Sequence, residues 1–274
     1  MREAILELTD VGVTYANGVR ALAHASLSFR AGEFTVLLGA SGAGKSTLLR
    51  TLNQLVTPTQ GLIEARGIGR LNTNRALRRH RRSTAMVFQR DQLIARLSAL
   101  DNVLTGRLPH HPSWRTFLPL PRRDLELALH CLQRVGLADR ALTRVDQLSG
   151  GQRQRVGIAR ALAQEPRIIL ADEPVASLDP VNSDKVLGLL RSICEADGIT
   201  AIVSLHQLEY ALRYADRIVG LAHAQVVFDG SPGALDSPHL DRIYGDLRRS
   251  EPHSPLAAAA GPDSFLNPSV ETSP

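Results

Sequence analysis

"TVLLGASGAGKSTLLRTL", residues 35–52, joins an apolar run, a glycine-rich loop and a leucine-rich segment. The apolar run is typical of a buried strand, and the leucines recur at the spacing of one helix face. Between them, "GASGAGKS" at 39–46 fits the pattern G-x-x-x-x-G-K-[S/T]. A strand before this pattern and a helix after it are the context in which such a loop binds phosphate. The stretch therefore predicts an α/β nucleotide-binding protein.

Each part of the loop has a separate task in this prediction. The glycines allow backbone N–H groups to curl around phosphate oxygens at the positive end of a helix. Lys45 would reach the β- and γ-phosphates, and the hydroxyl of Ser46 would bind Mg²⁺. Lysine stands at only two positions, 45 and 185, which favours a site that needs a compact ammonium. The nucleotide contacts expected here are Gly39, Ala40, Ser41, Gly42, Ala43, Gly44, Lys45, Ser46 and Thr47.

A second motif, "RIILADE" at 167–173, is an apolar strand that ends in two carboxylates. Asp172 suits the Mg²⁺ shell, and Glu173 points elsewhere and can accept a proton from an attacking water. Two solvated carboxylates at a strand end are common in isolation. The phosphate loop in the same chain favours the functional interpretation.

A second glycine-rich stretch, "QLSGGQRQRVGIARAL", occupies residues 147–162. The hydroxyl of Ser149 and the N–H groups of Gly150 and Gly151 stand at the start of a predicted helix, which makes a second anion site. One phosphate loop is enough to hold one nucleotide. The second stretch therefore needs an explanation of its own.

Four single residues carry weaker signals. Gln89 ends the predicted strand at 83–89 and could orient water or Mg²⁺, although a polar strand terminus looks the same. His206, which ends "AIVSLH", could contact a γ-phosphate or be a structural histidine. Tyr15 could stack on adenine or pack in the core. Asp179 is explained fully as the N-cap of a helix over 180–197, with Pro180 at its first position.

The pattern along the chain alternates short apolar runs with helical periodicity, which indicates a mostly parallel sheet covered by helices. The first helix is expected over about 44–55, with Leu48, Leu49, Leu52 and Leu55 on one face. Between about 90 and 150, helical segments flank a loop that contains Trp114 and Phe117, and this texture predicts an inserted helical subdomain. The aromatic residues would fill its local core or contact a partner subunit. The last residues are rich in proline, serine and alanine, which predicts disorder.

Composition narrows the class of protein. Hydrophobic residues make up 43% and charged residues 22% of the 274, as in ordinary globular proteins, and no apolar run approaches the roughly 20 residues that span a bilayer. The first residues are acidic where a signal peptide would be apolar, which places the chain in the cytoplasm. Cys131 and Cys194 are expected to be reduced structural thiols. The arginine-rich run at 75–82 is either a nucleic-acid patch or a solvated helix face, and the absence of interleaved aromatics favours the second.

The ordered set of motifs resembles the nucleotide-binding subunit of an ABC transporter. It comprises Tyr15, "GASGAGKS", "VFQ", "LSGGQ", "ILADEP", "ASLD" and "SLH", and the resemblance covers residues 1 to about 240. "LSGGQ" is the specific member of the set, because kinases and GTPases with the same phosphate loop lack it. The resemblance implies an α/β P-loop NTPase core with a mostly parallel sheet, an N-terminal antiparallel β part and an inserted α-helical subdomain. It places the core at 1–89 and 150–248, the helical subdomain at 90–149 and a disordered tail at 249–274.

The resemblance also assigns roles to residues, with ATP and Mg²⁺ as cofactors. Tyr15 would be the aromatic that stacks on adenine and Lys45 the phosphate lysine. Ser46 and Gln89 would bind Mg²⁺, and Asp172 would bind it through water. Glu173 would be the general base and His206 the switch histidine, with Gln89 as the third member of the catalytic set.

In ABC ATPases two subunits meet head to tail, so that the signature of one faces the phosphate loop of the other. The resemblance therefore implies a homodimer in which Ser149, Gly150, Gly151, Gln152 and Asp179 reach the nucleotide of the partner subunit. It implies two transmembrane permease subunits, a separate solute-binding protein and a peripheral position on the cytoplasmic face of the inner (plasma) membrane. No nucleic acid is expected.

Details within the motifs resemble the ATP-binding subunit of phosphonate importers. They are "ADEPVASLDP", the serine and leucine before His206, and "GRLPHHPSWRTFLPLPRRD" in the insert. This resemblance implies alkylphosphonates as the substrate class, with phosphate esters or phosphite as further members. Importers of phosphate, polar amino acids or metal chelates are the alternatives. A soluble ABC ATPase that acts on DNA or ribosomes is disfavoured, because residues 50–146 lack sustained heptads and the chain holds one cassette. A regulatory subunit with degenerate motifs is disfavoured because every catalytic position is filled.

Overall fold

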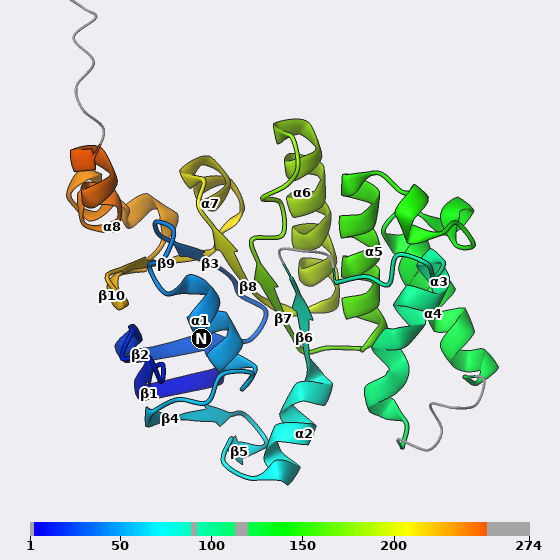
Figure 1. Ribbon diagram of the computed structural model, residues 1–274, viewed down its shortest axis with the longest axis horizontal. Coiled ribbons are helices and arrows are strands. Elements are labelled where there is room, and N and C mark those ends of the chain that lie inside the picture. The colour runs from blue at the N-terminus through cyan, green and yellow to red at the C-terminus, as the bar shows by residue number, and fades with distance from the viewer. Residues whose placement is uncertain (1–2, 89–91, 113–119, 251–274) are drawn as a thin grey trace, which may run out of the picture.

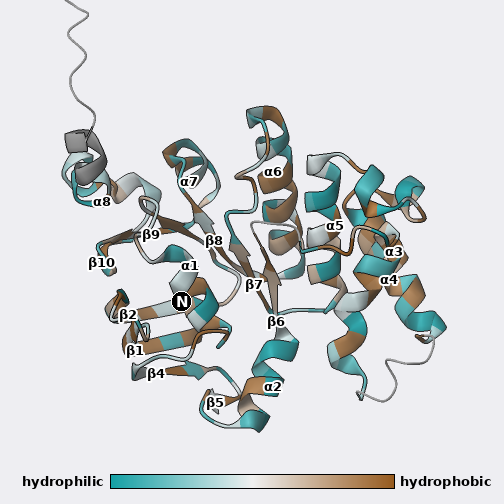
Figure 2. Cartoon of the chain, in the orientation of Figure 1, coloured by the Kyte–Doolittle hydropathy of each residue, from teal (hydrophilic) through white to brown (hydrophobic). Residues whose placement is uncertain are grey.

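The computed structural model describes residues 3–88, 92–112 and 120–250. Its centre is a six-stranded sheet with the strand order β10-β9-β3-β8-β7-β6 (Figure 1). The strands are β3 (Phe34–Leu38), β6 (Thr84–Val87), β7 (Ile168–Asp172), β8 (Thr200–Leu205), β9 (Arg217–Ala222) and β10 (Gln225–Gly230). All neighbours pair in parallel except β10, which is antiparallel to β9. Every residue of β3, β6, β7 and β8 is buried, as expected for a parallel sheet covered on both faces, and Figure 2 shows these strands as hydrophobic.

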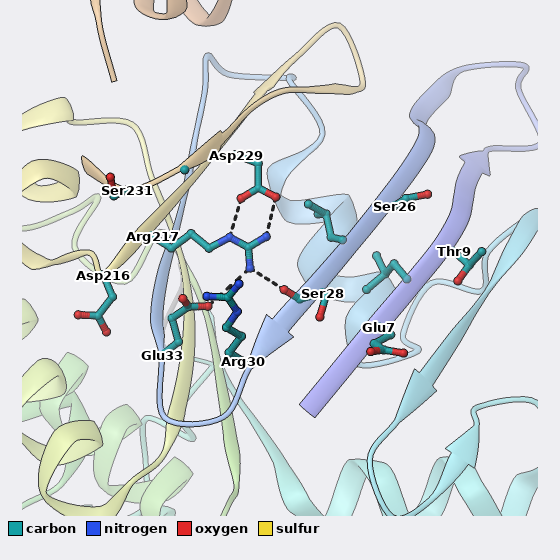
Figure 3. Close-up of a pocket in the computed structure, with 13 residues that line it drawn as sticks. Glu7, Thr9, Ser26, Ser28, Arg30, Glu33, Asp216, Arg217, Asp229 and Ser231 are labelled. Carbon is teal, nitrogen blue, oxygen red and sulfur yellow. Dashed lines mark hydrogen bonds and ion pairs between the residues drawn. The ribbon is translucent and has the colours of Figure 1, made fainter. Parts of the chain in front are cut away.

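A second sheet, with the order β2-β1-β4-β5, confirms the predicted antiparallel β part. Its strands are β1 (Ala4–Thr14), β2 (Arg20–Arg30), β4 (Gln60–Ala65) and β5 (Gly69–Arg70). Arg217 of β9 joins the two sheets at an open groove of about 670 Å³ (Figure 3). Its guanidinium donates to both carboxylate oxygens of Asp229, at 2.5 and 2.6 Å, and to the carbonyl of Ser28 at 2.5 Å. Asp229 thus holds the guanidinium within the central sheet, and the bond to Ser28 of β2 connects the two sheets.

Eight α-helices cover the sheets in the described part of the chain. They are α1 (Lys45–Leu52), α2 (Asn74–Ser83), α3 (Ala99–Leu104), α4 (Arg122–Arg134), α5 (Gly150–Ala163), α6 (Pro180–Asp197), α7 (Leu208–Tyr214) and α8 (Ser237–Ser250). The 3-10 turns are η1 (Thr105–His110), η3 (Ala138–Arg140), η4 (Val145–Gln147) and η5 (Pro232–Ala234). Helices α3, α4 and α5 pack against one another on one side of the molecule, and α1 lies on the face near the antiparallel sheet (Figure 1).

One predicted detail of the first helix is wrong. Leu48, Leu49 and Leu52 are fully buried, but Leu55 is 50% exposed. The helix ends at Leu52, with Asn53 as its C-cap, and Gln54 then takes a positive φ of 55°. Because the chain leaves the helix before Leu55, that residue no longer follows the helical period.

Other local predictions agree with the structure. Asp179 caps α6, and its carboxylate accepts the N–H of Asn182 at 3.0 Å. Cys131 and Cys194 are free and buried, and burial raises the pKa of the two thiols to about 11 and about 12. The described residues contain no helix that is long and apolar enough to cross a membrane. Helix α8 ends at Ser250, two residues into the segment 249–274 that is expected to be disordered, and 251–274 lie outside the described residues, as do Trp114 and Phe117.

Candidate nucleotide-binding site

The phosphate loop lies between the carboxyl end of β3 and the start of α1. Gly44, the N-cap of α1, has a φ of 106°, and a Cβ there would lie 2.5 Å from the carbonyl oxygen of Ala21. A Cβ at Gly39 would lie 2.4 Å from the carbonyl oxygen of Leu221. Both clashes are with backbone, so a side chain at either position would displace the loop. Gly42 has a φ of 79° but open space around it. The fold of this chain alone therefore requires glycine at Gly39 and Gly44.

Lys45 is the buried cation of the loop. Its side chain is 4% exposed, and its ammonium donates to the carbonyls of Gly39 at 2.7 Å and Ala40 at 3.0 Å. Burial lowers the pKa of Lys45, and the negative charges of Glu173 and Asp172 oppose that shift. The Glu173 carboxylate lies 3.9 Å from the ammonium. A cation held in this way beside loop N–H groups can exchange a carbonyl partner for a phosphate oxygen.

The two carboxylates at the end of β7 occupy different environments. Asp172 is 2% exposed, and its Oδ1 accepts hydrogen bonds from the hydroxyls of Ser46 at 2.8 Å and Ser204 at 3.0 Å. Glu173 has a φ of 45°, and its N–H donates to the hydroxyl of Ser204 at 2.9 Å. The left-handed backbone turns Glu173 out of the strand pattern, so that adjacent carboxylates face different partners.

Ser204 is the residue of this group that sequence reasoning missed. It lies on β8 directly opposite Asp172, in the register that pairs the two parallel strands. Its hydroxyl accepts from the backbone N–H of Glu173 and donates to the carboxylate of Asp172, and so links the backbone of one residue to the side chain of the other. Its place two residues before His206 is visible in the sequence, but the partner across the strands is known only from the register.

Tyr15 and His206 approach the loop from two other elements. The hydroxyl of Tyr15 lies 3.3 Å from that of Thr47 in the first turn of α1, and the tyrosine is 39% exposed. His206 is exposed and follows the carboxyl end of β8, next to the end of β7 that holds Asp172. Gln89 lies outside the described residues. The structure thus brings the phosphate loop, the two carboxylates and Tyr15 together, with His206 at the same edge of the sheet.

The signature residues are placed differently. Ser149 is the N-cap of α5 and forms a capping box with Gln152, with distances of 3.3 and 2.9 Å. A Cβ at Gly151 would lie 3.6 Å from the side-chain oxygen of Asn182, so this helix start lies beside that of α6, capped by Asp179. Hydrogen bonds from Asn182 lower the pKa of Asp179. Within the residues that the structure describes, no hydrogen bond joins residues 149–152 to the loop at 39–47.

Comparison with known proteins decides the family. The family model described as ABC transporter matches residues 22–176, a span that includes the phosphate loop, the signature and both carboxylates. The chain belongs to the ABC transporter family. It is 62% identical to a phosphite import ATP-binding protein of Stutzerimonas stutzeri, over 100% of this chain and 98% of that protein. It is 58% identical to a phosphonates import ATP-binding protein of Nostoc sp., over 88% of this chain and 92% of that protein.

Solved structures of ABC cassettes agree with this assignment. A dimeric ATP-binding cassette in a post-hydrolysis state, bound to ADP and Pi, is 36% identical with a TM-score of 0.72 and covers 83% of this chain and 99% of its own. An ABC transporter of putative metal-chelate type in an inward-facing conformation is 29% identical with a TM-score of 0.76 and covers 88% and 89%. The predicted fold class is confirmed. The phosphate loop is explained by nucleotide binding in this family, of which the cassette bound to ADP and Pi is an example.

Two residues of the arginine-rich run at 75–82 contact the end of α1, the helix that follows the phosphate loop. His80 is buried, and its ring nitrogen lies 2.8 Å from the carbonyl of Leu52 at the end of α1. Arg81 donates to the carbonyls of Asn53 and Gln54 just beyond that helix, at 3.3 and 2.5 Å. Arg75, Arg78 and Arg79 are exposed. The run is therefore in part a solvated face, as expected, and in part a cap for the carbonyl end of α1.

Proposed function

We propose that this ABC ATPase powers the import of phosphonates. The observation that supports this best is the similarity to import ATP-binding proteins named for phosphonates or phosphite, at 47 to 62% identity over 85 to 100% of this chain. Phosphite is the second candidate, because the relative with 62% identity carries that name. Both solutes are small phosphorus oxyanions.

The residues of the phosphate loop take the triphosphate in this proposal. The N–H groups at 39–47 surround the β-phosphate at the start of α1, and Lys45 turns from its two carbonyl partners to the β- and γ-phosphates. Tyr15, held beside the first turn of α1, stacks on the adenine. The burial of Lys45 strengthens its attraction to phosphate, because the dielectric constant is lower there than in water.

The oxygen groups around Ser46 and Asp172 fit a magnesium ion. They are hard donors 2.8 Å apart at the mouth of the phosphate loop, and Mg²⁺ prefers such oxygens together with those of phosphate. Ser46 would bind the ion directly, Asp172 through water, and Gln89 would complete the set. The ion would neutralise charge on the β- and γ-phosphates.

Hydrolysis follows from the placement of Glu173. Its carboxylate stands 3.9 Å from the Lys45 ammonium that reaches the γ-phosphate, so it can accept a proton from a water aligned with that phosphate. His206, from the neighbouring strand end, would contact the γ-phosphate from the other side. The hydrogen bond from the Glu173 N–H to Ser204 fixes the backbone from which the base projects.

The signature completes the site only from a second copy of the chain. The start of α5 and the start of α6 form one edge, with Ser149, Gly150, Gly151, Gln152 and Asp179, and that edge has no hydrogen bond to the loop of its own chain in the described residues. Two copies related by a twofold axis would place each edge over the other's nucleotide. ATP then holds the dimer closed, and hydrolysis opens it.

The remaining partners follow from the importer assignment. The ATPase dimer would sit under two permease subunits on the cytoplasmic face of the membrane, with a separate solute-binding protein on the other side. The core would comprise residues 1–89 and 150–248. The helical subdomain would comprise residues 90–149, whose helices α3 and α4 pack on α5, and it would contact the permease. No nucleic acid takes part.

Reconstitution in liposomes tests the substrate. The ATPase is assembled with its permease subunits, and ATP hydrolysis is measured with the binding protein loaded in turn with methylphosphonate, phosphite, phosphate or a polar amino acid. We expect methylphosphonate to stimulate hydrolysis most. Stimulation by phosphite alone would select the second candidate, and stimulation by phosphate or an amino acid would reject both while leaving the ATPase assignment intact.

A further inference from the structure

Helix α8 (Ser237–Ser250) lies beyond the part of the chain that the family model matches. It packs against β9 and β10, at the edge of the central sheet near α7 (Figure 1). Nothing in the motif set gives it a task. Three of its side chains nevertheless make defined contacts with the sheet and with the end of β8.

Two of these contacts fix the helix against the sheet. The ring of His239 meets that of Phe228 on β10 edge to face, with centroids 4.8 Å apart. Ile243 is 2% exposed and fills a hollow over Gly220 of β9, where a Cβ would lie 2.5 Å from its Cδ1. The two residues are four apart and so share one face of α8. Gly220 leaves the space that lets this face lie directly on the strand.

The third contact reaches the catalytic edge of the sheet. The hydroxyl of Tyr244, next to Ile243, donates to the carbonyl of His206 at 3.1 Å. That carbonyl belongs to the peptide between His206 and Gln207, and Gln207 is the N-cap of α7. The peptide is therefore the hinge between β8 and α7. Burial raises the pKa of Tyr244 to about 12, so the hydroxyl remains a donor at every pH used for ATPase assays.

The neighbours of His206 show why such a bond matters. Ser204 is held by Asp172 and Glu173, and Leu205 is buried and paired with Leu38 of β3. His206 is the first residue of this strand end that is exposed, so the strand no longer fixes it. A side chain that must meet a γ-phosphate within a fraction of an ångström needs a fixed backbone.

We propose that α8 is a brace for the switch histidine and that Tyr244 is the positioning residue that connects the two. The inference rests on the proposed role of His206 and goes beyond it, because it brings the helix after the matched cassette into the catalytic step. Without the Tyr244 hydroxyl, the peptide at 206–207 loses a fixed orientation, and the imidazole reaches the γ-phosphate in fewer of its conformations.

The test is Tyr244→Phe in the full-length chain, which removes one hydroxyl and keeps the ring. We expect kcat for ATP hydrolysis to fall about three- to tenfold, while KM for ATP changes by less than about twofold. Tyr214→Phe is the matched control. Tyr214 also donates from a hydroxyl whose pKa is raised to about 12, but its partner is Asp184 on α6, at 2.6 Å, and it does not bond to His206.

A second readout separates positioning from general damage to the fold. The imidazole resonance of His206, identified by its loss in His206→Ala, should shift in Tyr244→Phe and stay in place in Tyr214→Phe. An unchanged resonance together with wild-type kcat in Tyr244→Phe, beside an inactive His206→Ala, would overturn the brace alone. Equal loss of kcat in both tyrosine variants would overturn it too. Full turnover in His206→Ala would reject the proposed role of the histidine, and the brace with it.

Discussion

The phosphate-loop half and the signature half of the site differ in how far one chain can organise them. At the loop, backbone clashes fix two glycines, and Lys45, Asp172 and Ser204 are held by short hydrogen bonds. At the signature, the start of α5 is satisfied by its own capping box and lies beside α6. The first half is built by the fold of this chain. The second half is a helix start that, in the proposed dimer, acts only when a second copy of the chain brings its nucleotide against it.

Both halves are nevertheless hydrogen-bonded to helix α2. The side chains of His80 and Arg81 donate hydrogen bonds to the carbonyls of Leu52 and Asn53 at the end of α1. The carbonyl end of α2, at Arg81 and Arg82, accepts the side-chain amide of Gln164, the C-cap of the signature helix α5, at 2.6 and 3.2 Å. The helices that carry the two halves are thus joined at their far ends by one arginine-rich helix.

Glu173→Gln should have the largest effect and acts on the loop half. The amide cannot accept the proton of water, so we expect turnover to fall by a factor of about 100 or more while ATP still binds. The ATP-bound variant should accumulate as a dimer, which gel filtration with ATP would show. Glu209→Gln, an exposed glutamate on α7, is the control and should behave as the wild type. A variant that stays monomeric in ATP would contradict the composite site.

Ser149→Arg makes the corresponding change in the signature half. A long cation on this edge blocks the approach of the second chain, so turnover should fall below about 1% of that of the wild type. The affinity of the monomer for ATP, measured by calorimetry, should stay within about twofold. Ser192→Arg places the same side chain at an exposed position of α6 and controls for its charge. Loss of ATP binding in the Ser149 variant would mean that the signature acts on the nucleotide of its own chain.

The difference between the halves also explains what sequence could predict. The phosphate loop, the Asp179 cap and the apolar strands are local patterns, and the structure has them where the residues indicate. The hydrogen bonds of Ser204, of Tyr244 and of the caps on α1 join residues 27 to 38 apart in sequence, and they depend on strand register and helix packing. The prediction that Leu55 lies on the buried face of the first helix was wrong, because the chain leaves the helix at Gln54, which has a positive φ. The assigned roles of Tyr15 and His206 stay predictions.

Two glycine substitutions, one in each half of the site, should differ in their effect on the free energy of unfolding. Gly44→Ala puts a methyl group 2.5 Å from a backbone oxygen at a φ of 106°, so we expect the free energy of unfolding to fall by about 2–3 kcal/mol. Gly151→Ala meets only an ordinary contact at 3.6 Å in the first turn of α5, and alanine stabilises a helix relative to glycine by up to about 0.5–1 kcal/mol. The alanine at 151 should therefore leave the monomer as stable or more stable. Urea unfolding of both variants measures the difference.

Turnover adds a second contrast to this pair. Gly151→Ala should still slow ATP hydrolysis several-fold, because the methyl group stands where the partner's phosphate has to approach the helix start. A stable monomer with reduced turnover would show that glycine is kept there for the second chain. Normal turnover in this variant would place the closest approach at Ser149 or Gly150 instead.

The smallest expected effect is the pH dependence of the contacts that hold α1 and α5 to α2, which are made by His80 and by Gln164. Burial lowers the pKa of His80 from its usual 6.5, so the folded chain favours the neutral ring under α1. A base with a lowered folded pKa contributes stability that is complete above about pH 6.5 and is lost as pH falls toward the folded value. The corresponding anchor of α5, the amide of Gln164, does not titrate. Acid should therefore loosen the loop half before the signature half.

His80→Gln isolates this contribution, because the amide can still reach the carbonyl of Leu52 but carries no titrating proton. We expect the wild type to lose unfolding free energy relative to the variant between pH 7.5 and 5.5, by at most about 1.4 kcal/mol per pH unit below 6.5. Urea unfolding at the two pH values gives the difference, in which the other titrating groups cancel. An equal change in the two proteins would mean that folding leaves the pKa of His80 unshifted, and the two halves would then respond alike to acid.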